Sequence, residues 1–287
     1  MKFYYLIFTI FFFPFIGVVQ TNFNGNWEGI IIRAGYPIEK GTLLYLELEA
    51  VNGFFSGYSR EEIVNTDKYA LKRISGSAKG DIITFKQVSI QKSSISSRIK
   101  WCRFQAELTF NKNTGYLEGN YESIDCKRVI GKIILYRTDV KLVKENVSEK
   151  GQYWFNEFLY GINEELNAPE IRITEREEFV FQPVFFEFDE SDIRPEHLVF
   201  IDEMIKVIKG HSDLRVKVIG HTDSDGTDDY NINLSKERAE SIIQYFVHHG
   251  LQADRLKFDF KGEKAPIDTN STSQGKQRNR RVDFSFI

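Results

Sequence analysis

The chain has 287 residues, enough for two domains with sizeable cores, and 41% of them are hydrophobic, an ordinary share for a folded protein. Its formal net charge is −3, which argues against a generally basic protein that tracks a phosphate backbone. The part from Glu177 onwards is also acidic, with 15 Lys and Arg against 21 Asp and Glu. We therefore expect no nucleic-acid partner.

The first twenty residues are typical of an export signal. Met1 and Lys2 precede an uncharged run, rich in Phe and Ile, that extends from Phe3 to Val19. A short basic start and an apolar run are features of a secretory signal peptide. Pro14 interrupts this run, whose length is at the lower limit of a membrane span, about 17 to 25 residues. We predict a signal peptide over residues 1–20 that is removed, and a retained anchor is the alternative.

Residues 21–138 alternate between apolar and polar side chains in short runs separated by turn residues. Leu44, Leu46 and Leu48, for example, share one face of such a run. A period of two is typical of half-buried strands. Eight strands are predicted, near residues 26–33, 42–50, 53–59, 67–76, 81–90, 101–110, 115–122 and 129–137. Because no helical stretch separates them, we predict an all-β, antiparallel, barrel-like domain.

The start of this domain, Gly25-Asn26-Trp27, weakly resembles the Gly-x-Trp start of lipocalins. The domain is shorter than an ordinary lipocalin, so we do not expect a ligand cavity. A membrane-inserted barrel would also alternate, with its apolar face outward. The strand near residues 115–122 offers no continuous apolar face, since Glu118 and Asn120 lie on one side and Gly119 on the other. We predict a barrel outside the membrane, and an inserted one is the alternative.

Cys102 and Cys126 are the two cysteines of the chain. Neither lies near the predicted signal peptide, which argues against a lipid anchor on an N-terminal cysteine. Export would place both in an oxidising compartment, where a disulfide persists. We predict a Cys102–Cys126 disulfide, and two buried free thiols are the alternative.

Residues 139–176 differ in composition from the strands before them. The stretch from Lys141 to Lys150 is polar and charged, which is typical of a linker. Apolar residues then recur at helical spacing between Gln152 and Leu166. We predict a linker that contains one short amphipathic helix.

Residues 177–287 combine strand and helix patterns. An apolar strand is expected from Val180 to Phe188, in which Pro183 indicates an edge position or a bulge. Two helices are expected from Pro195 to Gly210 and from about Leu234 to His248, and three further strands over 214–220, 256–262 and 282–286. This order predicts an α/β sandwich with helices on a mixed sheet, and an α+β protein overall.

Four short motifs place charged residues at one edge of this predicted sheet. Asp223 lies where the second strand ends, and Arg238 lies one turn beyond Leu234, so the helix can aim it back at that loop. A carboxylate accepts N–H bonds from an ammonium, and a guanidinium offers a planar fork to a carboxylate. The pattern predicts an amino-acid head group as ligand, and a purely structural Asp223–Arg238 pair is the alternative. The motifs are Phe185-Phe186-Glu187-Phe188-Asp189, Gly220-His221-Thr222-Asp223, Asn231 to Ala239, and Asn279-Arg280-Arg281-Val282.

In this order the motifs resemble the OmpA-like C-terminal domain of outer-membrane proteins, Pal-type lipoproteins and flagellar MotB proteins. The resemblance covers about residues 177–287. It implies non-covalent binding of peptidoglycan through the free end of diaminopimelate in the stem peptide. By position it implies that Asp223 takes the diaminopimelate ammonium and Arg238 its carboxylate. Asn231 and Arg281 would support the loop, and Thr222 belongs to the same set of binding positions.

Other kinds of chemistry find little support in the sequence. No nucleophile elbow, phosphate loop or zinc motif is present, so we expect neither an enzyme nor a cofactor. The acidic stretch after Asp223 has Asp228 where a calcium loop needs Gly and Leu234 where it needs Glu, so no metal site is predicted.

We predict an exported periplasmic protein, associated with the cell wall and the outer membrane, with peptidoglycan as its partner. One alternative is a structural subunit of an envelope complex whose β-domain docks an outer-membrane or envelope protein. Another is an enzyme that acts on the wall, with Asp223 or Glu237 as acid or base.

Overall fold

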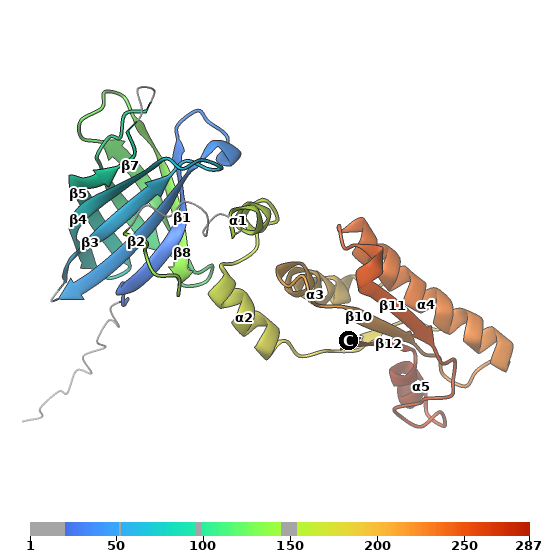
Figure 1. Ribbon diagram of the computed structural model, residues 1–287. Coiled ribbons are helices and arrows are strands. Elements are labelled where there is room, and N and C mark those ends of the chain that lie inside the picture. Colours follow the sequence, from blue (N-terminus) through green and yellow to red (C-terminus); the bar gives the residue numbers. More distant parts are fainter. Residues whose placement is uncertain (1–20, 52, 96–98, 145–153) are drawn as a thin grey trace, which may run out of the picture. The chain divides into compact units, whose positions relative to one another are not determined.

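The computed structural model describes residues 21–51, 53–95, 99–144 and 154–287 (Figure 1). The chain forms two compact units, one built from most of residues 1–152 and one from residues 153–287 together with 112–116. The predicted signal peptide over residues 1–20 lies outside the described residues. Among the described helices, none has the length and apolar character that a membrane span requires.

The first unit contains a closed antiparallel barrel whose eight strands follow one another in sequence order. β1 closes the barrel by pairing with β8, where Gly29 lies opposite Leu135. The barrel-like domain predicted from alternation is confirmed, and each predicted strand overlaps an observed one. The strands are β1 Gly25–Arg33, β2 Thr42–Val51, β3 Phe54–Glu62, β4 Tyr69–Lys79, β5 Ile82–Ser93, β6 Phe104–Phe110, β7 Tyr116–Ser123 and β8 Ile130–Thr138.

Alternation sends every second side chain of the strands into a shared apolar core. Trp27, Leu46 and Leu108 are fully buried in this core. Burying side chains of this size contributes about 1.5–3 kcal/mol each, which is why the pattern specifies the barrel. A run of neighbouring aromatic rings crosses the core and consists of Phe55, Phe85, Phe104 and Tyr121.

A buried ion pair and a disulfide occupy the same region of the barrel unit. The fully buried Lys72 donates from Nζ to Glu61 Oε1 at 2.5 Å, to Gln87 Oε1 at 3.1 Å and to the carbonyl oxygen of Cys102 at 2.6 Å. These acceptors match the three N–H bonds of the ammonium. Cys102 is bonded to Cys126, with their Cα atoms 5.8 Å apart, so the predicted disulfide is confirmed.

A hollow of about 1180 Å³ borders β1 and the strands from β3 to β8. The length of the domain did not predict a hollow of this size, and the expectation that the domain has no ligand cavity stays a prediction. The lining combines the aromatic Phe55 and Phe85 with the oppositely charged Lys86 and Glu107, and so indicates no single class of ligand.

The second unit contains a four-stranded sheet and most of the helices. Its strand order is β11-β10-β12-β9, with β10 parallel to β11 and antiparallel to β12, so the predicted mixed sheet is confirmed. The elements are α1 Trp154–Asn163, α2 Pro169–Glu178, β9 Val184–Phe185, α3 Leu198–Gly210, β10 Val216–Gly220, α4 Asp228–His248, β11 Leu256–Phe260, α5 Ser273–Asn279 and β12 Arg281–Phe286. Short 3₁₀ turns at Ile38–Lys40, Pro195–His197 and Ala253–Arg255 complete the described structure.

Helices α3 and α4 pack their apolar stripes against the sheet in a single core. Ile205 and Ile208 of α3 and Ile242 and Phe246 of α4 meet Val218 of β10 there. The edge position that Pro183 indicates is also confirmed, because β9 is an outer strand of the sheet. The strand predicted from Val180 to Phe188 shortens to two residues, since only these two pair with β12.

Helix α4 begins six residues earlier than the predicted start at Leu234. Thr227 caps it, with Oγ1 accepting the Tyr230 N–H at 3.3 Å. Asp228 and Asp229 follow in the first turn, where negative charge complements the helix dipole. This early start brings Asn231 onto the helix, one turn before Leu234.

Candidate functional site

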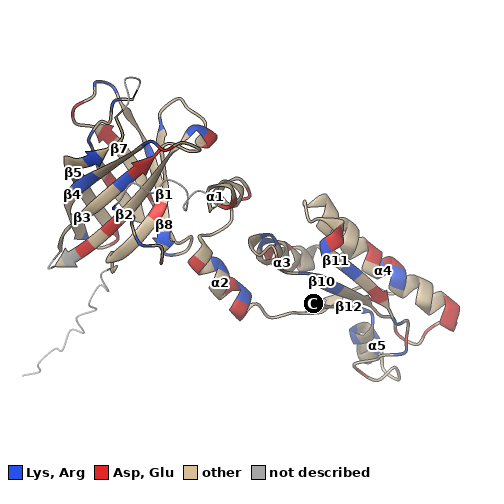
Figure 2. Ribbon diagram, viewed as in Figure 1, with Lys and Arg blue, Asp and Glu red and all other residues tan. Residues whose placement is uncertain are grey.

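Charged residues of both signs are interspersed over both units (Figure 2). In the second unit, several of them converge on a small hollow of about 200 Å³. The hollow lies where β10 ends, and its lining includes Asp223, Asn231 and Arg238 of the predicted site. Asp189, Asp225 and Arg280 contribute the other charges of the lining.

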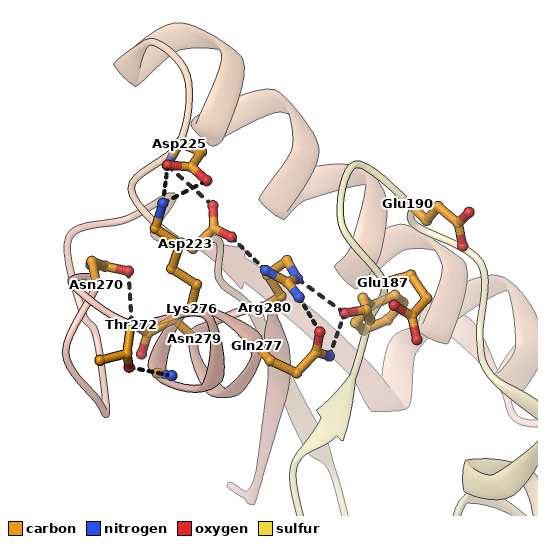
Figure 3. A network of polar contacts seen from close by, with 12 residues as sticks. Glu187, Glu190, Asp223, Asp225, Asn270, Thr272, Lys276, Gln277, Asn279 and Arg280 are labelled. Atoms are coloured by element: carbon orange, nitrogen blue, oxygen red, sulfur yellow. Dashed lines mark hydrogen bonds and ion pairs between the residues drawn. The ribbon is translucent and has the colours of Figure 1, made fainter.

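Asp223 is buried, with 3% of its surface exposed, in the loop between β10 and α4. Its Oδ1 accepts the Asp225 N–H at 3.1 Å, and its Oδ2 accepts from Arg280 Nη1 at 2.7 Å (Figure 3). Each carboxylate oxygen has two lone pairs, so both keep capacity for another donor.

Arg238 is fully buried on α4 and is held by the backbone. Nε donates to the Glu190 carbonyl at 2.8 Å, Nη1 to the His221 carbonyl at 3.0 Å and Nη2 to the Glu187 carbonyl at 3.0 Å. A guanidinium has five N–H bonds, so one on each terminal nitrogen stays uncommitted by these contacts. The ion-pair partner of Asp223 is Arg280. The structural Asp223–Arg238 pair, the alternative considered from sequence, is therefore not the pair that forms.

Burial lowers the pKa of Arg238 to about 10, and the like charge of Arg280 adds to this effect. Asp223 and Asp189 oppose it. A pKa in this range still leaves the guanidinium charged at neutral pH. The hollow therefore holds a fixed positive charge beside a buried carboxylate.

Asn231 is 1% exposed and has one uncommitted atom facing this region. Its Nδ2 donates to Glu263 Oε2 at 2.6 Å, while its Oδ1 has no hydrogen-bond partner among the described residues. A buried acceptor without a donor costs about 1–3 kcal/mol. An N–H group of a ligand would satisfy it.

Thr222 and Arg281, the other two predicted residues, lie outside the lining of the hollow. Thr222 is buried, and its N–H donates to the Gly262 carbonyl at 3.0 Å. Arg281 donates from Nε to both oxygens of Asp283 at 3.0 Å and from Nη2 to the Ala265 carbonyl at 3.2 Å. Burial raises the pKa of Asp283, but bonds from His221 and Arg281 outweigh it and lower that pKa overall.

Two basic residues at the site, Lys276 and Arg280, were not among the residues predicted to bind the ligand. Arg280 contacts Asp223 and also donates to Gln277 Oε1, while Lys276 donates to both Asp225 oxygens at 2.6 and 2.8 Å (Figure 3). Both residues are placed by α5, which has no apolar stripe to reveal it. The local clue is Thr272, whose Oγ1 caps this helix by accepting the Gly275 N–H at 3.1 Å.

Residues 185–280 match the model of the OmpA family. The C-terminal domain is OmpA-like. Outer membrane protein A of Bordetella avium is 36% identical over 103 residues, which are 36% of this chain and 53% of that protein. The peptidoglycan-associated lipoprotein of Pseudomonas aeruginosa is 37% identical over 100 residues, 35% of this chain and 59% of that protein.

The solved structure of the peptidoglycan-associated lipoprotein from Burkholderia pseudomallei is 23% identical, with a TM-score of 0.36, over 37% of this chain and 90% of that one. This chain spans little more than half the length of the two curated relatives. All the hollow-lining residues of the OmpA-like domain lie within the family match. The barrel lies outside it.

Proposed function

We propose that the OmpA-like domain anchors this protein non-covalently to peptidoglycan by holding the zwitterionic end of diaminopimelate in the hollow. One observation carries the proposal: a buried carboxylate and a buried guanidinium, Asp223 and Arg238, line the same space of about 200 Å³. The names of the relatives, outer membrane protein A and peptidoglycan-associated lipoprotein, support a place in the cell envelope next to the wall.

The ammonium of the ligand would donate to Asp223 and to the unpartnered Oδ1 of Asn231. The carboxylate would accept the two uncommitted N–H bonds of Arg238. Charge-assisted bonds of this kind are stronger than neutral ones. The hollow is smaller than the pockets that enclose a drug-sized ligand, about 300–1,000 Å³, so it suits the end of a larger polymer.

Binding of this kind is an equilibrium in which no covalent bond is made or broken. It places the protein in the periplasm at the cell wall. Removing one half of a desolvated charge pair leaves the other charge poorly compensated, at a cost of about 2–5 kcal/mol. The two halves of the site should therefore depend on each other.

Co-sedimentation with purified sacculi tests this proposal. The parent should pellet, and D223N, which loses the negative charge but keeps the shape, should stay in the supernatant. The matched control is D213N, because Asp213 is exposed and pairs with Arg176 at 3.0 Å, outside the hollow. D213N should pellet like the parent.

Competition then identifies the ligand. Free meso-diaminopimelate should release the parent from sacculi. Nα-acetyl-lysine amide, whose free end carries an ammonium without an adjacent carboxylate, should release it much less. Pelleting of D223N at the parental level, or equal release by the two compounds, would contradict the proposal.

A further inference from the structure

The charges of the lining sum to zero when Lys276, which forms an ion pair with one of them, is included; Glu263, which bonds to the uncharged Asn231, is not part of this sum. The lining carries three carboxylates, Asp189, Asp223 and Asp225, and two guanidiniums, Arg238 and Arg280. Lys276 is not in the lining, but its ammonium contacts both oxygens of Asp225 at 2.6 and 2.8 Å. With Lys276, three negative charges face three positive ones.

A neutral hollow favours a head group that is itself neutral overall. The free end of diaminopimelate is such a group, since its ammonium and carboxylate cancel. An end whose carboxylate is amidated keeps only the ammonium and carries a net positive charge. Its amide NH₂ would also face Arg238, a side chain that offers donors and no acceptor.

We propose that Lys276 is a specificity-determining residue, which makes the hollow prefer a free diaminopimelate carboxylate over an amidated one. The inference rests on the proposed function of the same site. Without Lys276 the hollow gains a net negative charge, which attracts the cationic amidated end and repels the free carboxylate.

Lys276 is connected to the ligand-binding carboxylate of Asp223 through one residue, Asp225. Asp225, which Lys276 holds, donates its N–H to Asp223 Oδ1 at 3.1 Å (Figure 3). The side chains of Lys276 and Asp225 are 29% and 41% exposed, so salt screens their charges in part. Glu263 stands behind Asn231, outside the lining, and is unchanged in every variant below.

The test uses the full exported chain and two synthetic tripeptides, L-Ala-γ-D-Glu-meso-diaminopimelate in which the carboxylate beside the free ammonium is either free or amidated. Isothermal titration calorimetry gives the ratio of the two dissociation constants. The parent should favour the free form, and K276M should reduce this preference by about threefold to tenfold, the size of a partly exposed charge interaction. The effect should shrink as the salt concentration rises.

Two further variants separate charge from structure. The double variant D225N/K276M restores neutrality and should recover the parental preference. K264M changes the net charge equally, but Lys264 is paired with Asp228 at 3.9 Å, outside the lining, and should leave the preference unchanged.

An unchanged ratio in K276M, an equal change in K264M, or no recovery in the double variant would overturn the inference while the proposed function stands. Failure of the parent to bind either peptide would overturn the proposed function, and this inference with it.

Discussion

Replacing Arg238 by Lys keeps the positive charge of the hollow but removes most of its bonds to the backbone. Arg238 donates to the carbonyls of Glu187, Glu190 and His221 at 2.8 to 3.0 Å. Lysine has a compact ammonium in place of the planar fork, and we expect it to reach one of the three. Each lost bond from a charged donor contributes about 1.5 kcal/mol or more. R238K should therefore lower the free energy of unfolding of the OmpA-like domain by about 3 kcal/mol.

Urea unfolding measures this change separately from the barrel. The α-helices of the described chain all belong to the second unit, so circular dichroism at 222 nm reports on it. R194K is the control, because the Arg194 side chain is a third exposed and pairs with Glu187 and Glu196 at the surface. This variant should change the free energy of unfolding by less than about 0.5 kcal/mol. Equal midpoints for R238K and the parent would refute the argument. Because Arg238 also stabilises the fold, the co-sedimentation test of function uses D223N and not a variant of Arg238.

Two further predictions concern stability. The double variant C102S/C126S opens a loop of sequence separation 24 and should lower the stability of the barrel by about 3.5 kcal/mol, measured by urea unfolding followed through tryptophan fluorescence; an unchanged midpoint would contradict this. Burial raises the pKa of Asp283, but hydrogen bonds from His221 and Arg281 outweigh it and hold that pKa below its usual 3.8. The stability that Asp283 contributes is therefore present above pH 3.8 and is lost as the pH falls through the pKa of the folded state. D283N should therefore show a shallower loss of stability in acid than the parent, in unfolding measured at several pH values, and parallel profiles would count against it.

The barrel could be predicted from the sequence because apolar and polar residues alternate along its strands, and the apolar ones are those that the core buries. The alternation around Leu44, Leu46 and Leu48 reflects a core that every strand shares, so the pattern gives both the strand positions and the face. The mixed sheet of the second unit was also predictable, since its strands and two long helices carry apolar patterns of the correct period.

Elements without an apolar pattern were not predictable. Helix α2 buries none of its residues, and α5 has seven residues and no stripe. Sequence analysis indicated Asp223, Asn231 and Arg238, which share the hollow, but α5 also places Lys276 and Arg280 beside them. The roles of individual residues in diaminopimelate binding, the domain boundaries and the removal of residues 1–20 stay predictions.

The last strand of the OmpA-like domain lies between two strands that precede it in the chain. β12 pairs with β10 on one side and β9 on the other, and the hollow needs Arg280 just before it. Because synthesis starts at the N-terminus, the barrel strands are complete long before the last strand of the OmpA-like domain is available. Until Arg281–Phe286 inserts, β9 stays separated from β10 and β11 and the hollow is incomplete, so binding of any ligand there has to wait until the whole domain has been synthesised and folded.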